Sequence, residues 1–193
     1  MKPILRDFPD EILTERLLIR APRAGDGAEL RAAVKDSWTE LKQWMPWAAG
    51  ELPDEAYYEA RVRQGRAKFL LREDLTLLLF KQGTSTIVGS SGLHRINWKV
   101  PRFEIGYWVR TPYAGQGYIT EAVRGIATFA FDTLGARRVE IRCDARNERS
   151  AAVARRAGFE LEATLRREGR HHVTDELRDT LIFARTAPDP HDA

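Results

Sequence analysis

A strand, a glycine-containing turn and a helix are predicted to follow one another between Arg102 and Gly135. From Arg102 to Arg110 the side chains alternate between an apolar face and a face with Glu104, Gly106 and Trp108, as in a strand with two unlike sides. The helix that follows shows an apolar stripe of Ile119, Val123, Ile126, Ala127, Ala130 and Leu134. Gly135 marks its end. A strand that leads directly into an amphipathic helix indicates a mixed α/β domain.

Further strand and helix patterns along the chain support this fold class. Strands are predicted at 15–22, 75–80, 86–96, 137–143, 159–168 and 176–185, and helices at 26–44, 53–71 and 147–158. Asn147 is the expected N-cap of the last helix and Gly158 its stop. The order predicts an α+β fold with an antiparallel first half and a crossover helix in the second half.

Length and composition favour one domain at 1–185, followed by an unstructured tail at 186–193. The net charge of +3 suits a partner with phosphates but does not indicate direct binding of nucleic acid. One cysteine, Cys143, excludes an internal disulfide and fits a reducing compartment. The sequence contains no apolar run long enough for a membrane span and starts without a signal-peptide pattern. A cytoplasmic protein is therefore expected.

The turn in "YAGQGYITEAV" places Gly115 and Gly117 at the start of a helix. The free N–H groups and the positive end of the helix dipole make such a turn a potential phosphate site. It is not a dinucleotide fingerprint, because Thr120 stands where the third glycine would be, nor a Walker loop, because Tyr118 follows Gly117 instead of lysine. A phosphate-binding turn and a plain tight turn both remain open from these letters alone.

Several segments in sequence order resemble the GNAT superfamily of acetyl-CoA-dependent N-acetyltransferases, and within it the RimJ/RimL-type ribosomal-protein enzymes. The resemblance covers Leu13 to about Phe183. It is carried by "LTERLLIRAP", "SWTELKQWMPW", "IVGSSGLHRINW", "EIGYWVRTPYAGQGYITEAV" and "RVEIRCDARNERSAAVARRAGFELE". It implies a GNAT-like, mostly antiparallel sheet with helices on both faces and a central pair of strands that splay apart. A homodimer is compatible with the family.

The resemblance implies a coenzyme site in the wedge between the splayed strands. The pantetheine arm of acetyl-CoA would pair with the backbone of Trp108, Val109 and Arg110. The pyrophosphate would bind N–H groups of Ala114, Gly115, Gln116, Gly117 and Tyr118. Asn147 would contact the pantetheine arm, or serve only as an N-cap, and Arg149 and Arg155 are candidates for the 3′-phosphate.

Two positions depart from the family pattern. Pro112 stands where many members have glutamine or arginine before the first glycine, so the loop would depend on backbone donors. Ala154 stands where many have a tyrosine that protonates the leaving thiolate. Ser150 resembles the serine near the coenzyme sulfur in RimL-type enzymes and is the candidate acid here. It could equally be an ordinary first-turn residue.

Attack on a thioester requires a neutral amine, so a base must remove one proton. Glu104 is the first candidate, with an ordinary ion pair to Arg102 or another cation as the alternative. Glu168 is the second candidate, because the resemblance places an acid near there. The oxyanion would be stabilised by a backbone N–H near Val109.

Three other features invite functional interpretations. Cys143 has no histidine motif beside it and is expected to be a buried core thiol. His171 and His172, with His94 far away in sequence, do not form a metal-binding pattern, and no metal is expected. Trp38, Trp44 and Trp47 lie at helical spacing and are interpreted either as core residues or as lining of the acceptor cleft.

The sequence thus predicts transfer of acetyl from acetyl-CoA to a primary amine by direct attack in a ternary complex. The resemblance favours a protein N-terminus as the acceptor, ribosomal or other, with a small amine or antibiotic as an alternative. A non-catalytic acyl-CoA sensor is a further alternative, because of Ala154. A nucleotide-binding module is disfavoured by the missing lysine and third glycine.

Overall fold

The computed structural model describes residues 2–187 and contains one eight-stranded sheet in the order β1-β2-β3-β4-β5-β6-β8-β7. The strands are β1 (Glu11–Leu13), β2 (Leu17–Arg20), β3 (Leu75–Lys81), β4 (Ile87–Asn97), β5 (Arg102–Val109), β6 (Arg138–Asp144), β7 (Glu160–Arg170) and β8 (Leu177–Thr186). Neighbouring strands are antiparallel except β5 and β6, which are parallel. The predicted α+β fold is confirmed, although the sequence pattern did not indicate the short β1.

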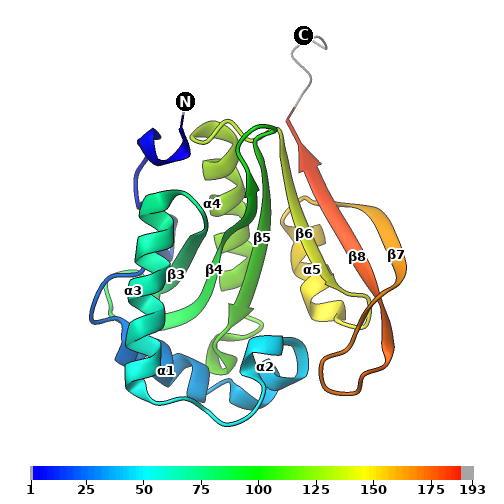
Figure 1. The fold of residues 1–193 in the computed structure, drawn as a ribbon, viewed down its shortest axis with the longest axis horizontal. Coiled ribbons are helices and arrows are strands. Elements are labelled where there is room, and N and C mark those ends of the chain that lie inside the picture. Colours follow the sequence, from blue (N-terminus) through cyan, green and yellow to red (C-terminus); the bar gives the residue numbers. More distant parts are fainter. Residues whose placement is uncertain (1, 188–193) are drawn as a thin grey trace.

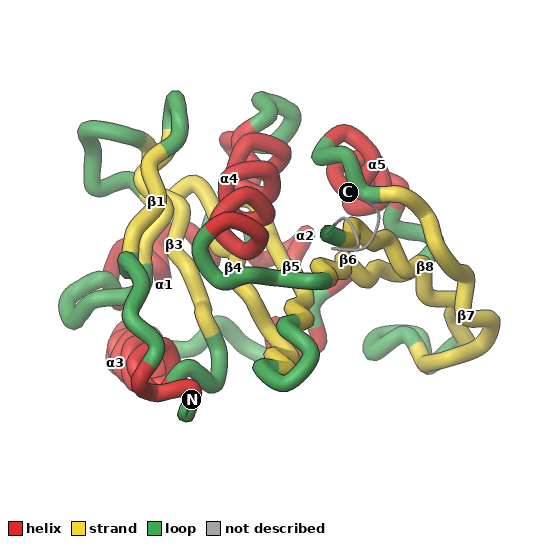
Figure 2. The backbone as a smooth tube through the Cα atoms, turned by 90° about the horizontal axis from the view of Figure 1, so that it is seen from above, coloured by secondary structure: helices red, strands yellow, loops and turns green. Residues whose placement is uncertain are grey.

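Helices cover both faces of this sheet (Figure 2). The helices are α1 (Gly27–Lys35), α2 (Trp38–Trp44), α3 (Glu55–Leu71), α4 (Tyr118–Asp132) and α5 (Glu148–Arg156), with 3-10 turns η1 (Pro3–Leu5), η2 (Pro46–Ala48) and η3 (Thr111–Tyr113). The connection from β5 through α4 to β6 is the expected crossover between parallel strands. α4 and α5 lie on one face, and α1 and α3 on the other.

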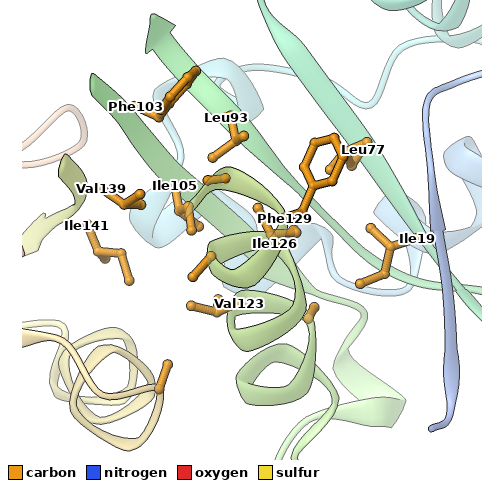
Figure 3. Packing of buried hydrophobic residues seen from close by; sticks show 14 of the residues in the cluster. Ile19, Leu77, Leu93, Phe103, Ile105, Val123, Ile126, Phe129, Val139 and Ile141 are labelled. Carbon is orange, nitrogen blue, oxygen red and sulfur yellow. The ribbon is translucent and has the colours of Figure 1, made fainter. Parts of the chain in front are cut away.

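The main core lies between α4 and the sheet (Figure 3). The apolar stripe of α4 supplies Val123, Ile126 and Phe129. The strands oppose it with Ile19, Leu77, Leu93, Phe103, Ile105, Val139 and Ile141. These positions alternate along each strand, so the same strands present a different set of side chains to the α1 and α3 face. The site is built on that second face.

The helix predicted from 26 to 44 is interrupted at Asp36 and Ser37 and forms α1 and α2 instead. Ser37 is fully buried, and its hydroxyl donates to the Ala33 carbonyl at 3.0 Å. The same oxygen accepts the N–H of Thr111 at 2.9 Å. A serine that bonds to a carbonyl four residues earlier competes with the helix ladder, and here it also ties the break to the end of β5.

The central strands β5 and β6 separate along their length (Figure 1). Their register pairs only Arg102, Phe103 and Glu104 with the first three residues of β6. β4, in contrast, pairs with β5 as far as Val109. The gap opens toward the ends of the two strands from which the chain continues to α4 and α5. The implied splay of the central pair is confirmed.

The sheet extends beyond the predicted domain end at residue 185. Thr186 is the last residue of β8 and lies opposite Arg138, and the Ala187 N–H donates to the Arg137 carbonyl at 3.0 Å. Residues 186 and 187 of the predicted tail are therefore ordered against β6, and the rest of that segment, 188–193, lies outside the described residues. No helix within residues 2–187 has the length and apolar character needed to cross a membrane.

Candidate active site

A cleft of about 650 Å³ opens on the α1 and α3 face of the sheet where β5 and β6 separate. One part of its wall is aromatic and includes Trp44, Trp47 and Trp108. Another part is polar and includes side chains of β4, β5, β6 and α5. Residues from Pro22 to Thr180 contribute, so the cleft exists only in the complete fold.

Titratable groups form a row across the floor of the cleft. His94 of β4 lies opposite Glu104 of β5, and Asp74 immediately precedes β3, whose first residue, Leu75, pairs with Leu93. The Nδ1 atom of His94 is 2.8 Å from the Oδ2 atom of Asp74. Burial alone would raise the pKa of Asp74, but hydrogen bonds from His94 and Thr76 outweigh it, and the net pKa is lowered. Sequence analysis missed this Asp74–His94 pair.

Glu104 points into the cleft with 19% of its side chain exposed. Its carboxylate has an ion pair with Arg95, whose Nη1 atom is 3.5 Å away, so the alternative of a pair with Arg102 or another cation is met by Arg95. Burial raises the pKa of Glu104, opposed by the positive charges of Arg95 and Arg142. The position and the raised pKa are compatible with a base, and that role stays a prediction.

Ser150 and Tyr107 face each other across the opening between β5 and α5. The Tyr107 hydroxyl donates to the Ser150 carbonyl at 2.9 Å, and the Ser150 hydroxyl donates to Tyr107 Oη at 3.2 Å. Burial raises the pKa of Tyr107, so the phenol is neutral at physiological pH. The pair places two hydroxyls at the first turn of α5, and Tyr107 is a second residue that sequence analysis missed.

Cys143 lies next to this pair and lines the cleft. It is partly exposed, so the expectation of a buried thiol is wrong, although its side chain packs against the main core. Burial of part of the side chain raises the pKa of the thiol, opposed by a hydrogen bond with Ser150. A thiol with a raised pKa is a poor nucleophile, in agreement with the absence of a histidine motif beside it.

Asn147 is the N-cap of α5, as predicted: its Oδ1 atom accepts the N–H of Ser150 at 3.0 Å. The residue also lines the cleft. Its amide NH₂ group is not used in the cap, because the cap uses only the oxygen. A contact with the coenzyme is thus compatible with capping and stays a prediction.

The glycine turn takes the left-handed conformation that its sequence indicated. The φ angles of Gly115 and Gly117 are +75° and +83°. The turn, Ala114 to Tyr118, lies outside the cleft lining at the start of α4, and all of it except Tyr118 is exposed. Arg16 lies against it, because its Nη1 atom donates to the Gln116 carbonyl at 3.0 Å and its guanidinium covers the Tyr118 ring. Arg16 is a cation at the turn that sequence analysis missed.

The three residues expected to pair with the pantetheine arm differ in where their backbone groups and side chains point. The Arg110 N–H donates to the Val88 carbonyl at 2.8 Å, and its guanidinium bridges Glu29 of α1 and Asp36, the C-cap of α1. In an antiparallel pair successive residues point to opposite edges, so the backbone N–H and carbonyl of Val109 point toward the gap beside β6. Trp108 contributes its ring to the cleft. The geometry thus favours Val109 for backbone pairing.

Of the other predicted site residues, one lines the cleft and two lie outside its lining. Glu168 lines the cleft, but its oxygens bind Arg142 at 2.9 Å and the Thr180 hydroxyl at 2.7 Å. The hydrogen bond from Thr180 is the main cause of its lowered pKa, which weakens the case for a base. Arg149 and Arg155 are exposed and lie outside the cleft lining, and Arg155 packs over the Phe183 ring.

The predicted tryptophans also separate. Trp44 and Trp47 line the cleft, whereas Trp38 packs against a small apolar cluster around Val34 and Leu41.

Two histidines of the loop between β7 and β8 hold α2 in place. The Nε2 atoms of His171 and His172 lie 2.9 Å from the Gln43 carbonyl and 2.8 Å from the Lys42 carbonyl. Within residues 2–187, no group of three histidine, cysteine or acidic residues is arranged to hold a metal ion.

Residues 16–160 match the family described as the acetyltransferase (GNAT) domain, so the chain belongs to the GNAT acetyltransferases. It is an enzyme of that class, as its splayed sheet and cleft also indicate.

Among its relatives is YdaF of Bacillus subtilis (strain 168), a protein named provisionally as a ribosomal N-acetyltransferase. The two are 29% identical over 81% of this chain and 84% of YdaF. The ribosomal-protein-serine acetyltransferase of Escherichia coli (strain K12) is 31% identical over 56% of this chain and 58% of that protein.

Solved structures share the fold. RimL, the ribosomal L7/L12 α-N-protein acetyltransferase, in complex with coenzyme A, has a TM-score of 0.82 at 23% identity and covers 91% of this chain and 97% of its own. The microcin C7 self-immunity acetyltransferase MccE, in complex with acetyl-CoA and AMP, also has a TM-score of 0.82, at 21% identity over 90% of this chain and 94% of its own. The resemblance to RimJ/RimL-type GNAT proteins is confirmed.

Proposed function

We propose that the enzyme transfers acetyl from acetyl-CoA to the α-amino group of a protein N-terminus. The observation that supports this most directly is the open edge at the end of β5, where the Val109 backbone is unpaired by β6 and the cleft-lining residues Glu104 and Tyr107 precede it on the same strand. An extended coenzyme arm can pair with such an edge as an added strand would. Complexes of the structural neighbours with coenzyme A and acetyl-CoA support the same co-substrate.

The residues of the cleft can perform the transfer without a covalent enzyme intermediate. An α-amino group has a pKa of roughly 7.7–8.0, so only one proton must be removed before the nitrogen attacks the thioester carbonyl. We assign stabilisation of the oxyanion to the N–H of Val109. We assign protonation of the leaving thiolate to the Ser150 hydroxyl, and its hydrogen bond with Tyr107 supports this role.

Ala154 favoured a non-catalytic acyl-CoA sensor at the sequence level. In the structure Ala154 is fully buried, and the hydroxyl of Ser150 lies one helical turn before it. Tyr107 brings a phenol to that turn from β5. Tyr107 therefore supplies a phenol beside the first turn of α5 although Ala154 lacks one, which supports an active enzyme over a sensor.

The names of two relatives support a ribosomal protein as the acceptor. The cleft itself fits the chemistry of an amine: Glu104 and Asp74 supply negative charge, and Trp44, Trp47 and Trp108 supply apolar surface for the adjoining part of the acceptor. The N-terminus of a peptide and a small amine can both bind such a surface, so the test includes both kinds of acceptor.

The test is release of free thiol from acetyl-CoA in the presence of peptides with free N-termini, the same peptides with blocked N-termini, and small amines. We expect release with free peptides only and a mass increase of one acetyl group at the terminal nitrogen. Release with small amines alone would contradict a protein acceptor and assign the enzyme to small amines instead. Binding of coenzyme A without release for any acceptor would contradict the proposal.

A further inference from the structure

The geometry points to His94, held by Asp74, as the group that takes the proton from the acceptor amine. This inference rests on the proposed function, and it assigns to His94 the role that the sequence gave to Glu104. Three observations carry it: the hydrogen bond that fixes the imidazole, the space in which the ring lies, and the ion pair of the competing carboxylate.

The contact with Asp74 determines which nitrogen of His94 is basic. An ionised carboxylate accepts hydrogen bonds only, so the proton between Asp74 and His94 belongs to Nδ1 of the imidazole. Nε2 of the neutral ring then carries a free lone pair. The second oxygen of Asp74 accepts the Thr76 hydroxyl at 2.7 Å, which fixes the carboxylate in turn. This is the arrangement of an oriented imidazole base.

Two glycines of the sheet make room for the imidazole on the floor of the cleft. A Cβ atom on Gly92 would be 3.0 Å from Nε2 of His94 and 2.5 Å from the Leu75 carbonyl oxygen. A Cβ atom on Gly106 would be 3.6 Å from the same Nε2 atom. The ring therefore lies over these two backbones, with Nε2 leaning from Glu104 toward Gly106, the next cleft-facing residue along β5 in the direction of Val109.

His94 and Glu104 differ in what already surrounds them. Glu104 has Arg95 3.5 Å away, whereas Nε2 of His94 has no hydrogen-bond partner among the described residues. The charged groups around His94 come from each neighbouring element: Asp74 before β3, Arg95 on β4, Glu104 on β5 and Lys68 on α3. In this setting Glu104 attracts the ammonium form of the acceptor, and His94 receives the proton.

The step is balanced with the proposed transfer. The ammonium group first loses one proton to Nε2 of His94, which passes it to water. The neutral nitrogen then forms a bond to the thioester carbon and loses its second proton to Nε2, and the carbon–sulfur bond breaks. The thiolate takes a proton from Ser150, which regains one from water, and the imidazolium releases its proton to water. The products are an amide and a free thiol, and both side chains return to their starting states.

The experiment compares wild type with His94→Ala, with and without added imidazole, and with Asp74→Asn. Base catalysis contributes about 10²–10⁴-fold, so we expect kcat for His94→Ala to fall by at least about 100-fold and to recover in part with imidazole. For Asp74→Asn we expect the acid limb of the kcat/KM profile to move to lower pH, because loss of the carboxylate destabilises the imidazolium. The matched control is Asp7→Asn, at an exposed position outside the cleft.

Binding of coenzyme A and the unfolding midpoint are measured for every variant, so that loss of the fold is separated from loss of the base. The pH profile of kcat/KM is measured for both aspartate variants, and Asp7→Asn should leave it unchanged. A folded His94→Ala enzyme with wild-type kcat would overturn the inference and leave the proposed function intact. Absence of turnover by wild type with every acceptor would overturn both.

Discussion

The two faces of β5 differ in burial and in the kind of side chain they carry, although they are made by alternate residues of one eight-residue strand. On the α4 side Phe103 and Ile105 are each 1% exposed and belong to the main core. On the other side Glu104, Gly106 and Trp108 are partly exposed and line the cleft. The first face contributes stability through packing as far as Ile105, beyond which Tyr107 presents its hydroxyl to Ser150, and the second face presents chemical groups to the cleft.

This difference determines where a substitution should act. The stability that the core face contributes depends on how completely its side chains fill the available volume, because the core is close-packed. The cleft face depends on single atoms such as Nε2 of His94 and on the space that Gly92 and Gly106 leave open. Changes on the α4 side should therefore lower the free energy of unfolding, and changes on the cleft side should lower turnover.

The largest effect is expected for Phe103→Ala. Phe103 packs edge-on against Trp98 with 5.2 Å between ring centroids, so its loss leaves a cavity in the core. We expect the free energy of unfolding to fall by about 3–5 kcal/mol, measured by denaturant titration. The rate per folded molecule should change little. A loss of stability below about 1 kcal/mol would show that the core face tolerates voids.

Gly92→Ala should have the next largest effect, with Gly106→Ala as its matched comparison. The new Cβ atom at position 92 would clash with the Leu75 carbonyl and push the imidazole of His94, whereas the one at position 106 meets His94 at an ordinary 3.4 Å. We expect Gly92→Ala to cost about 1–3 kcal/mol of stability and to lower kcat, and Gly106→Ala to keep most of both. Equal effects in the two variants would argue that the ring moves freely.

Glu104→Gln should lower kcat/KM by about tenfold, mainly through KM, because a charge that attracts the ammonium group is lost. Its stability effect has the opposite sign to that of a core change. Since burial raises the pKa of Glu104 in the folded state, the charged carboxylate opposes folding as pH rises through that pKa. The variant should thus gain slightly over wild type at neutral pH, and the gain should vanish below about pH 4.

A fall in kcat for Glu104→Gln that exceeds the fall for His94→Ala would assign the proton transfer to Glu104. The two variants are compared with the same acceptor and at saturating acetyl-CoA, so that only the step at the amine differs.

Ser150→Ala is expected to lower kcat by about tenfold, because the thiolate would lose its nearest proton donor. Ser85→Ala, in the exposed turn between β3 and β4, is the matched control. If an acyl-donor analogue of acetyl-CoA with a better leaving thiol suppresses the defect, the hydroxyl acts on the departing sulfur. A defect that persists unchanged with that analogue would contradict the acid role.

The smallest effect is expected for Asn147→Ala, which removes the cap of α5. Loss of an N-cap costs about 1 kcal/mol, and Asn147→Asp should restore it because aspartate caps equally well. Coenzyme A affinity distinguishes the two functions of the residue. If affinity falls in both variants while stability falls only with alanine, the amide NH₂ contacts the coenzyme.

Local patterns in the sequence predicted the elements but not their contacts. Alternation and apolar stripes gave the strands and helices, and the N-cap role of Asn147 was correct because a cap depends on three neighbouring residues. The break at Ser37 was missed because it depends on Thr111, which lies 74 residues away. The same limit applies to Arg110, whose side chain is held by the carboxylates of Glu29 on α1 and of Asp36 just after it.

The candidate site was predicted where one segment supplies it and missed where several do. The glycine turn, Glu104 and Ser150 were found from motifs or from the family resemblance. Asp74 and His94 are 20 residues apart and meet only because β3 and β4 pair in one register. A usable sign was present, because a histidine in an alternating strand and an acid just before the preceding strand can lie side by side in a hairpin.

The position of β8 in the sheet affects when the cleft can form during synthesis of the chain. β8 lies between β6 and β7, and it follows both of them in the chain. A chain that stops before Leu177 lacks the strand that joins β7 to the sheet, and with it Thr180, which holds Glu168 at the cleft. During synthesis on the ribosome the cleft is therefore among the last parts to form. A nascent chain that still lacks residues from Leu177 onward therefore has no complete cleft.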